Sequence, residues 1–254
     1  RRKAKDIEKG IVVNKPYLAL AKKELVMLFK TPIYLMNSVG GVLIGPIILA
    51  ISVLSNDQSI EPLVNVLYSN LNIVTLGTIA FIAFLGIMNS VGSTTFSREG
   101  KNLWIQRTLP IRAEDQIIGR LLASLVIQVL GIIVTIISLI LIIRLELINI
   151  VLIILIGLFA SIPMTEIGMC IDIIRPMQNW TNPQQAMKQN LNVLIGMGLA
   201  VVYGGLIGLL CFYLYNKINI SLIYLIIVII LAITAIVLFV VLKKLITKQF
   251  QELE

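Results

Sequence analysis

Residues 117–143 have the sequence IIGRLLASLVIQVLGIIVTIISLILII, an apolar run with Arg120 as its one charged residue. A helix needs about 20 mostly apolar residues to cross the hydrocarbon core of a bilayer, so this run predicts a membrane-spanning helix. The segment before it, FSREGKNLWIQRTLPI at residues 96–111, is charged, and another apolar run precedes that segment. Long apolar runs separated by polar segments are typical of a multi-pass membrane protein.

Composition supports the same fold class along the whole chain. Of the 254 residues, 58% are hydrophobic and only 13% are charged, whereas about 25% charged residues is usual in soluble domains. We therefore predict an all-α integral membrane protein, with a cytoplasmic basic segment at residues 1–32 and a six-helix transmembrane bundle at residues 33–254. The expected spans are residues 33–54, 73–91, 117–143, 147–164, 191–215 and 220–242.

The positions of Lys and Arg predict the orientation, because basic segments stay on the cytoplasmic side. With both termini in the cytoplasm, nineteen basic residues lie inside, counting Arg120 with the loop before the third span, and only Arg144 and Lys217 lie outside. We expect a multi-pass protein of the cytoplasmic membrane. The net charge of +8 is then mainly a signal for orientation, and no separate soluble domain supports nucleic-acid binding.

The start of the chain predicts an interfacial helix before the first span. Six residues cluster on one side of a helical wheel, with Lys23 and Lys30 opposite; they are Tyr17, Leu18, Ala21, Leu25, Leu28 and Phe29. Such a helix is expected to lie among the lipid headgroups, although the simpler alternative is a basic flank that only sets orientation. The chain opens with Arg1 and shows no cleavage motif, so we expect a fragment without a signal peptide.

Small and polar residues within the spans predict helix packing. Gly41 and Gly45, just before Pro46, and Gly204 and Gly208 form small-xxx-small patterns that let helices approach closely. In the second span, polar and small residues share one side of the helix and should avoid lipid; they are Thr75, Thr78, Gly86, Asn89 and Ser93. This stripe either packs against neighbouring helices or lines a translocation path.

The first cytoplasmic loop has features beyond those of a connector. Glu114 and Asp115 fit the first turn of the third helix, where carboxylates oppose the helix dipole. Between Gly100 and Pro110 the chain can form a short helix with Leu103, Trp104 and Ile105 on an apolar side. Such a helix could dock on a partner; alternatively, Trp104 anchors at the lipid interface and the bases only set orientation.

The second cytoplasmic loop, expected from Glu166 to Asn190, is too polar and punctuated to cross lipid. Asp172, Trp180 and Lys188 are candidates for a second partner contact. The alternative is a capped connection in which a helix starts at Asn182-Pro183. Glu166, the acid nearest a span, is expected at a cytoplasmic helix end or facing protein.

Several motifs together resemble the permease subunits of bacterial type-2 ATP-binding cassette exporters, over nearly the whole chain. The matching segments are Lys23-Glu24-Leu25, Lys30 to Tyr34, Ser97 to Lys101 with Trp104, Leu109 to Ile111, Asn179 to Asn182, and Lys188 to Asn190. The resemblance implies that the first cytoplasmic loop seats on a separate ATPase subunit. The implied coupling residues are Arg98, Glu99, Gly100, Lys101, Trp104, Leu109 and Pro110.

The resemblance also implies the partners. A cassette ATPase would bind ATP and magnesium, and a second six-helix half, in the same full-length chain or a second copy, would complete the path. The chain itself has no histidine and no phosphate-binding glycine loop, so we expect no catalytic site, no bound cofactor and no metal. Cys170 and Cys211 are expected to be packing residues. The alternatives are half of a secondary carrier or channel, or a membrane-embedded enzyme or scaffold.

Overall fold

The computed structural model describes residues 15–54, 70–143 and 145–251, and these residues form helices without strands. Five of the helices are long and apolar enough to cross a membrane, or six if the bent pair α2 and α3 counts as one span. The protein is therefore an all-α, multi-pass membrane protein. The first fourteen residues of the expected basic segment, and Arg144 on the expected outer side, lie outside the described residues.

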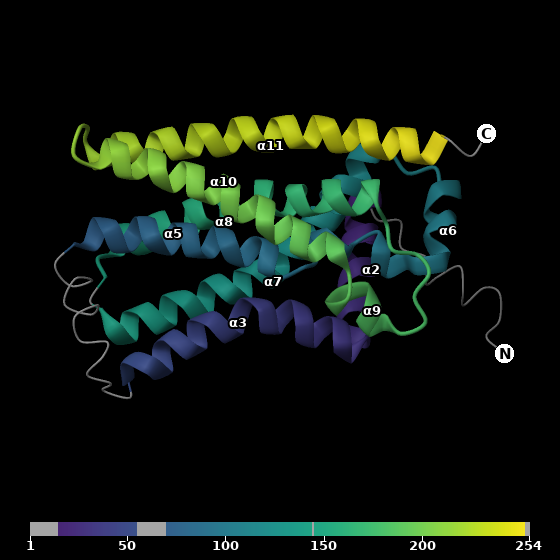
Figure 1. The fold of residues 1–254 in the computed structure, drawn as a ribbon, viewed down its shortest axis with the longest axis horizontal. Helices are drawn as coiled ribbons and strands as arrows, with labels where there is room; N and C mark the ends of the chain where they lie inside the picture. The colour runs from purple at the N-terminus through teal and green to yellow at the C-terminus, as the bar shows by residue number, and fades with distance from the viewer. Residues whose placement is uncertain (1–14, 55–69, 144, 252–254) are drawn as a thin grey trace.

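The long helices run side by side along the long axis of the molecule (Figure 1). They are α3 (Pro32–Leu54), α5 (Leu71–Met88), α7 (Ala113–Ile142), α8 (Leu147–Ile174), α10 (Leu191–Tyr215) and α11 (Ile220–Gln251). Helix α8 is central, because it packs against α5, α7, α10 and α11. The main apolar core lies along its length, where Ile153 and Ala160 meet Ile82 and Ile227.

The shorter helices gather at one end of the bundle (Figure 1). Helix α2 (Pro16–Lys30) meets α3 at an angle of 99°, and α6 (Leu103–Thr108) and α9 (Pro183–Lys188) lie at the same end. Helix α2 ends at Lys30 because Thr31 precedes Pro32, and the residue before a proline avoids the helical conformation. By the distribution of basic residues, this end is the one predicted to face the cytoplasm.

Three predicted helix ends differ from the structure. The second helix was expected to continue to Val91 but ends at Met88, so Asn89 and Ser93 leave the stripe that Thr75 and Thr78 begin. The fourth was expected to end near Met164 but continues to Ile174. The sixth continues past Leu242 to Gln251, because polar and charged residues are good helix formers once the chain leaves the hydrocarbon region.

Helix α2 is amphipathic in a different way from the prediction. The residues it buries against the protein are Leu20, Ala21, Glu24 and Leu28, while Leu18 and Phe29 are about half exposed. Thus only one edge of the predicted apolar side packs on the bundle. The other edge remains outside, where an interfacial helix would meet lipid.

The prediction of close packing at Gly41 is confirmed. A Cβ atom at this position would lie 2.3 Å from the carbonyl oxygen of Met88, because the end of α5 crosses α3 there. Gly204 and Gly208, in contrast, meet no neighbouring backbone in the described chain and instead line an apolar groove between α5 and α10. A small residue permits close packing, but it does not create a neighbour.

We predict that Gly41→Ala destabilises the protein and that Gly77→Ala does not. The methyl group added at position 41 would collide with backbone, and overpacking of this kind costs about 1–3 kcal/mol. A Cβ at Gly77 would meet nothing within 4 Å, so Gly77→Ala serves as a matched control on α5. Thermal unfolding of the purified protein in nanodiscs tests this. Equal effects of the two substitutions would contradict the close approach at Gly41.

Candidate functional site

The candidate site is built around a buried break after α5. Asn89 keeps helical geometry, but Ser90 has a φ of 52°, and the chain then continues in two short 3₁₀ turns, η1 (Gly92–Thr94) and η2 (Ser97–Asn102). The Asn89 Oδ1 atom accepts a hydrogen bond from the Val91 N–H at 2.9 Å. A polar side chain close to the backbone favours such a turn over a continuing helix. Residues 89–100 are all buried.

Asp172 on α8 holds the second turn in place. Its Oδ2 accepts the backbone N–H groups of Phe96 at 2.6 Å and Ser97 at 3.0 Å, and its Oδ1 accepts from the Ser97 hydroxyl and from Asn192 Nδ2 at 2.9 Å. Free N–H groups at the start of a helical turn need acceptors when they are buried. Helix α8 can continue through Asp172, because protein groups and not lipid surround its carboxylate.

Trp180 closes the same turn from the second cytoplasmic loop. Its Nε1 donates to the Ser97 carbonyl oxygen at 2.8 Å, and its ring lies against Gly100. Gly100 has a φ of 54°, and a Cβ there would lie 2.8 Å from the indole. Both the backbone conformation and the contact therefore require glycine at this position.

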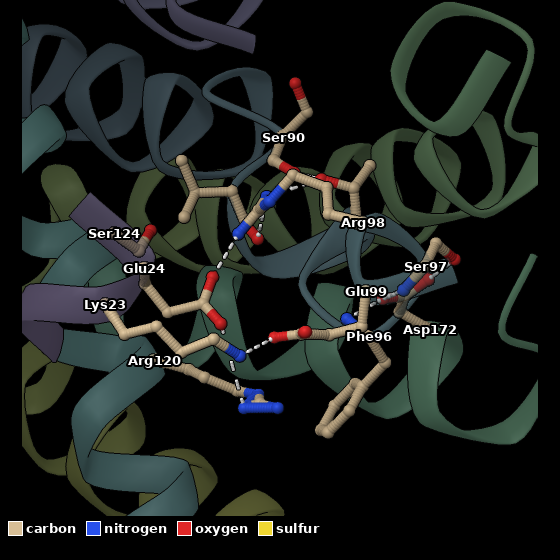
Figure 2. Close-up of polar contacts among 12 residues, drawn as sticks. Lys23, Glu24, Ser90, Phe96, Ser97, Arg98, Glu99, Arg120, Ser124 and Asp172 are labelled. Atoms are coloured by element: carbon tan, nitrogen blue, oxygen red, sulfur yellow. Dashed lines mark hydrogen bonds and ion pairs between the residues drawn. The ribbon is translucent and has the colours of Figure 1, made fainter. Parts of the chain in front are cut away.

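A charged pair joins this segment to α2 (Figure 2). Arg98 Nη2 lies 2.7 Å from Glu24 Oε2, and neither side chain has exposed surface. The Arg98 Nη1 atom donates to the Val91 carbonyl at 3.0 Å and to Thr94 Oγ1 at 2.7 Å. Burial alone would raise the pKa of Glu24, but the guanidinium charges of Arg98 and Arg120, with Lys23, hold it below its ordinary value.

Three more charged residues complete the cluster. Lys23 Nζ lies 2.5 Å from Glu99 Oε1, which also accepts from Gln106 Nε2 at 3.2 Å. On α7, the buried Arg120 guanidinium stacks 4.3 Å from the centre of the Phe96 ring. We call Lys23, Glu24, Arg98, Glu99 and Arg120 the charged cluster.

Helix α6 presents the exposed side of this region. Trp104 is 60% exposed, Ile105 is 43% exposed and Leu109 is 44% exposed, whereas Leu103 and Gln106 point inward and are buried. The exposed residues Lys101, Thr108 and Pro110 continue the surface. Because α6 emerges directly from η2, its position is fixed by the same buried turn.

The C-terminal part of α11 supports α6 from the side (Figure 1). Arg107 Nη2 donates to Gln249 Oε1 at 3.1 Å, and Lys243 Nζ lies 2.8 Å from Glu114 Oε1 at the start of α7. Glu114 and Asp115 occupy the first turn of α7, as predicted. The exposed surface is therefore attached to α11, which is in turn paired with the start of α7.

The structure separates the predicted coupling residues into two groups. Lys101, Trp104, Leu109 and Pro110 are exposed, but Arg98, Glu99 and Gly100 are buried and cannot touch an outside partner directly. It also brings Asp172 and Trp180 of the second predicted contact onto the first loop, and leaves Lys188 exposed and apart. The expected loop from Glu166 begins only at Arg175, because Glu166 and Asp172 belong to α8.

The predicted polar stripe is buried, in part as helix packing. Thr75 Oγ1 donates to the Leu71 carbonyl at 2.8 Å, and Thr78 is 7% exposed. Asn89 Nδ2 donates to Ser124 Oγ at 3.2 Å, and that hydroxyl lies 3.1 Å from Thr165 Oγ1. This seam of hydrogen bonds joins α5, α7 and α8. Ser93 bonds within its own turn, to the Ser90 carbonyl.

An apolar groove lies between α5 and α10, with a volume of about 510 Å³. Gly204 and Gly208 line it, together with Leu76, Gly77 and Phe84. It is separate from the charged cluster. Within the described residues, no three His, Cys, Asp or Glu side chains lie together as metal ligands would.

Sequence reasoning missed the roles of Glu24 and Arg120. A signal for Glu24 was present, because Leu20, Glu24 and Leu28 follow one another at intervals of four residues and so share one side of a helix. An acid at the centre of an apolar stripe predicts a buried, paired carboxylate. Its two arginine neighbours lie 74 and 96 residues away, and no local pattern predicts them.

Comparisons of the chain with protein-family models, with curated proteins and with solved structures find no match.

We predict that Asp172→Asn destabilises the protein and loosens the turn against Trp180. Asparagine has one acceptor oxygen in place of two, so some of the buried donors around Asp172 lose their acceptor, at a cost of about 1–3 kcal/mol. Asp115→Asn is the control, since it removes only a helix-dipole contribution of about 0.3–1 kcal/mol. Thermal unfolding and tryptophan fluorescence measure both effects. If the two variants behave alike, Asp172 does not hold the turn.

We predict that Glu24 makes stability depend on pH in the acid range. Its pKa in the folded protein lies below the ordinary value of 4.5, so the carboxylate stabilises the fold above that value and this stabilisation is lost as pH falls through the folded pKa. Glu24→Gln should be less stable at neutral pH and should vary less with pH below about 4.5. The measurement is the melting temperature as a function of pH. Parallel curves for the two proteins would contradict this role.

Proposed function

We propose that this protein is the membrane-spanning permease of an ATP-binding cassette exporter, driven by a separate ATPase subunit. The observation that carries the proposal is the pairing of an exposed apolar helix, α6, with a buried polar turn that connects it to the bundle. A permease of this kind needs a surface for its ATPase and a rigid connection from that surface to the membrane helices.

The exposed surface of α6 suits a protein partner. Trp104, Ile105 and Leu109 form an apolar patch with Lys101 and Arg107 nearby. Aromatic and arginine side chains are enriched among the residues that contribute most to protein interfaces. At the predicted cytoplasmic end of the molecule, such a patch supports docking of a soluble subunit.

The connection to the bundle has three parts. Asp172 ties η2 to α8, Glu24 and Lys23 tie it to α2, and Arg107 ties α6 to α11. A displacement of α6 would therefore pull on three helices at once. This supports α6 as a coupling helix, because interactions between packed elements convert a local movement into a change of the whole bundle.

The proposed permease would work with partner subunits in the cytoplasmic membrane. ATP and magnesium would bind the ATPase, and a second six-helix half, in the same full-length chain or in a second copy, would complete the path. The protein would lie in the cytoplasmic membrane with α2, α6 and α9 inside the cell. The exposed edge of α2 at Leu18 and Phe29, beside Lys22, supports a position for this helix in the lipid headgroup region.

A second candidate function is half of a secondary carrier. Glu166 on α8 is 1% exposed, and its Oε2 has no hydrogen-bond partner among the described residues. Buried acids of this kind carry protons or ions in many transporters. Transport that follows a proton gradient without ATP, and that Glu166→Gln abolishes, would favour this candidate over the exporter.

We predict that Trp104→Ala weakens binding of the full-length protein to its cassette ATPase. Loss of a central aromatic contact typically costs about 2 kcal/mol or more, which corresponds to about 30-fold in affinity. Phe212→Ala is a matched control, because Phe212 is also aromatic and exposed, at 83%, but lies in the apolar part of α10. Co-purification and titration with the purified ATPase provide the measurement. Absence of any bound ATPase would overturn the proposed function.

A further inference from the structure

Glu24 lies between two arginines that belong to different parts of the bundle (Figure 2). Its Oε2 pairs with Arg98 at 2.7 Å, and its Oε1 lies 3.9 Å from Arg120 Nη1. Arg98 belongs to the turn that leads into α6, whereas Arg120 belongs to the membrane helix α7. The first contact is a close ion pair, and the second is too long for a hydrogen bond.

In the contact between Glu24 and Arg120, both side chains keep atoms that have no hydrogen-bond partner. Among the described residues, Glu24 Oε1 and all three nitrogens of Arg120 have no hydrogen-bond partner, although both side chains are fully buried. Buried charged groups without hydrogen bonds cost free energy. Arg120 is therefore a buried cation that already faces an unused oxygen of Glu24.

The neighbours of Arg98 and Arg120 indicate what could change this arrangement. The other hydrogen bonds of Arg98 go to Val91 and Thr94, within its own segment, so Arg98 would move together with that segment. Phe96, whose ring stacks on Arg120, belongs to the same segment. A displacement of this turn would thus remove Arg98 from Glu24 and the aromatic ring from Arg120 in one movement.

Glu24 itself would stay behind. It belongs to α2, which packs along α7, and Gly119 on α7 lies against Tyr17 and Leu20 so closely that a Cβ there would be 2.8 Å from the Tyr17 carbonyl. Helices packed this closely resist displacement against each other, because close-packed interiors have low compressibility. The distance between Glu24 and Arg120 is therefore set within one rigid pair of helices.

We propose that Glu24 is a two-position switch: its carboxylate pairs with Arg98 when the turn before α6 is in place, and with Arg120 when this turn is displaced. In either position one buried guanidinium neutralises the carboxylate, so neither position leaves it unpaired. Breaking a buried pair without a replacement is strongly destabilising, and a second arginine gives the carboxylate a replacement partner. The exchange would let α6 move while α2 and α7 stay together.

The switch can be tested in the purified full-length protein without any partner. We would measure melting temperatures for Glu24→Gln, Arg120→Gln and the double variant, first with Arg98 present and then in an Arg98→Gln background. With Arg98 present, the coupling between the two substitutions should be weak, because Glu24 and Arg120 attract each other at 3.9 Å but share no hydrogen bond. Without Arg98, the double variant should shift much less than the sum, because the pair has formed.

Two results would overturn the switch. Coupling of equal size in both backgrounds would mean that removing Arg98 does not bring Glu24 onto Arg120, and coupling that falls without Arg98 would mean that Arg98 holds Glu24 beside Arg120. If Arg98→Gln does not fold, Arg98→Met replaces it, because methionine removes the charge that pairs with Glu24 and keeps an unbranched side chain. Gln106→Ala serves as a background control, because it removes a hydrogen bond of Glu99 without touching Arg98.

A second measurement relates the switch to transport, and this part alone depends on the proposed function. With the cassette ATPase and a non-hydrolysable ATP analogue bound, the coupling between Glu24 and Arg120 should increase even with Arg98 intact. Unchanged coupling in that complex would overturn the switch as a step of transport. Failure to find an ATPase would instead overturn the proposed function and leave the partner-free result standing.

Discussion

The buried turn between α5 and α6 is the constraint on which the rest of this end of the bundle depends. Residues 90–100 leave the α-helical hydrogen-bond pattern while surrounded by protein. Backbone groups in such a place must find partners, since water and lipid cannot supply them. Backbone groups of the turn bond directly to Asp172 and Trp180, and Glu24 acts on the turn through Arg98. These three residues come from different helices and loops.

This requirement explains why so much charge lies inside a membrane protein. Five members of the charged cluster come from α2, η2 and α7, and their signs nearly balance, with three bases and two acids. Asp172, whose charge also acts on Arg120, brings the count to three of each sign. Buried charges are tolerated when they are paired, so removing Glu24 would leave Arg98 without its counter-ion.

The same turn places α6, and this links structure to the proposed function. A helix of only six residues has little stability of its own, so its orientation comes from the anchored segment before it and from the contact with α11. The anchored segment and α11 therefore position Trp104, and a displacement of that segment would move it. The apolar groove between α5 and α10 lies in a different part of the molecule, toward the middle and the far end of the long helices.

Sequence alone determined the membrane class, the approximate spans and the first turn of α7, because apolar runs and terminal carboxylates are local signals. It also located the segments of the site, from Ser97 to Leu109 and from Asp172 to Trp180. Only the tertiary structure decided that Arg98 and Glu99 face inward, that Asp172 continues α8, and that Glu24 lies between Arg98 and Arg120. These facts depend on contacts between residues 74 to 96 positions apart, and the energy of a buried charge is set by such neighbours and not by the residues beside it in the chain.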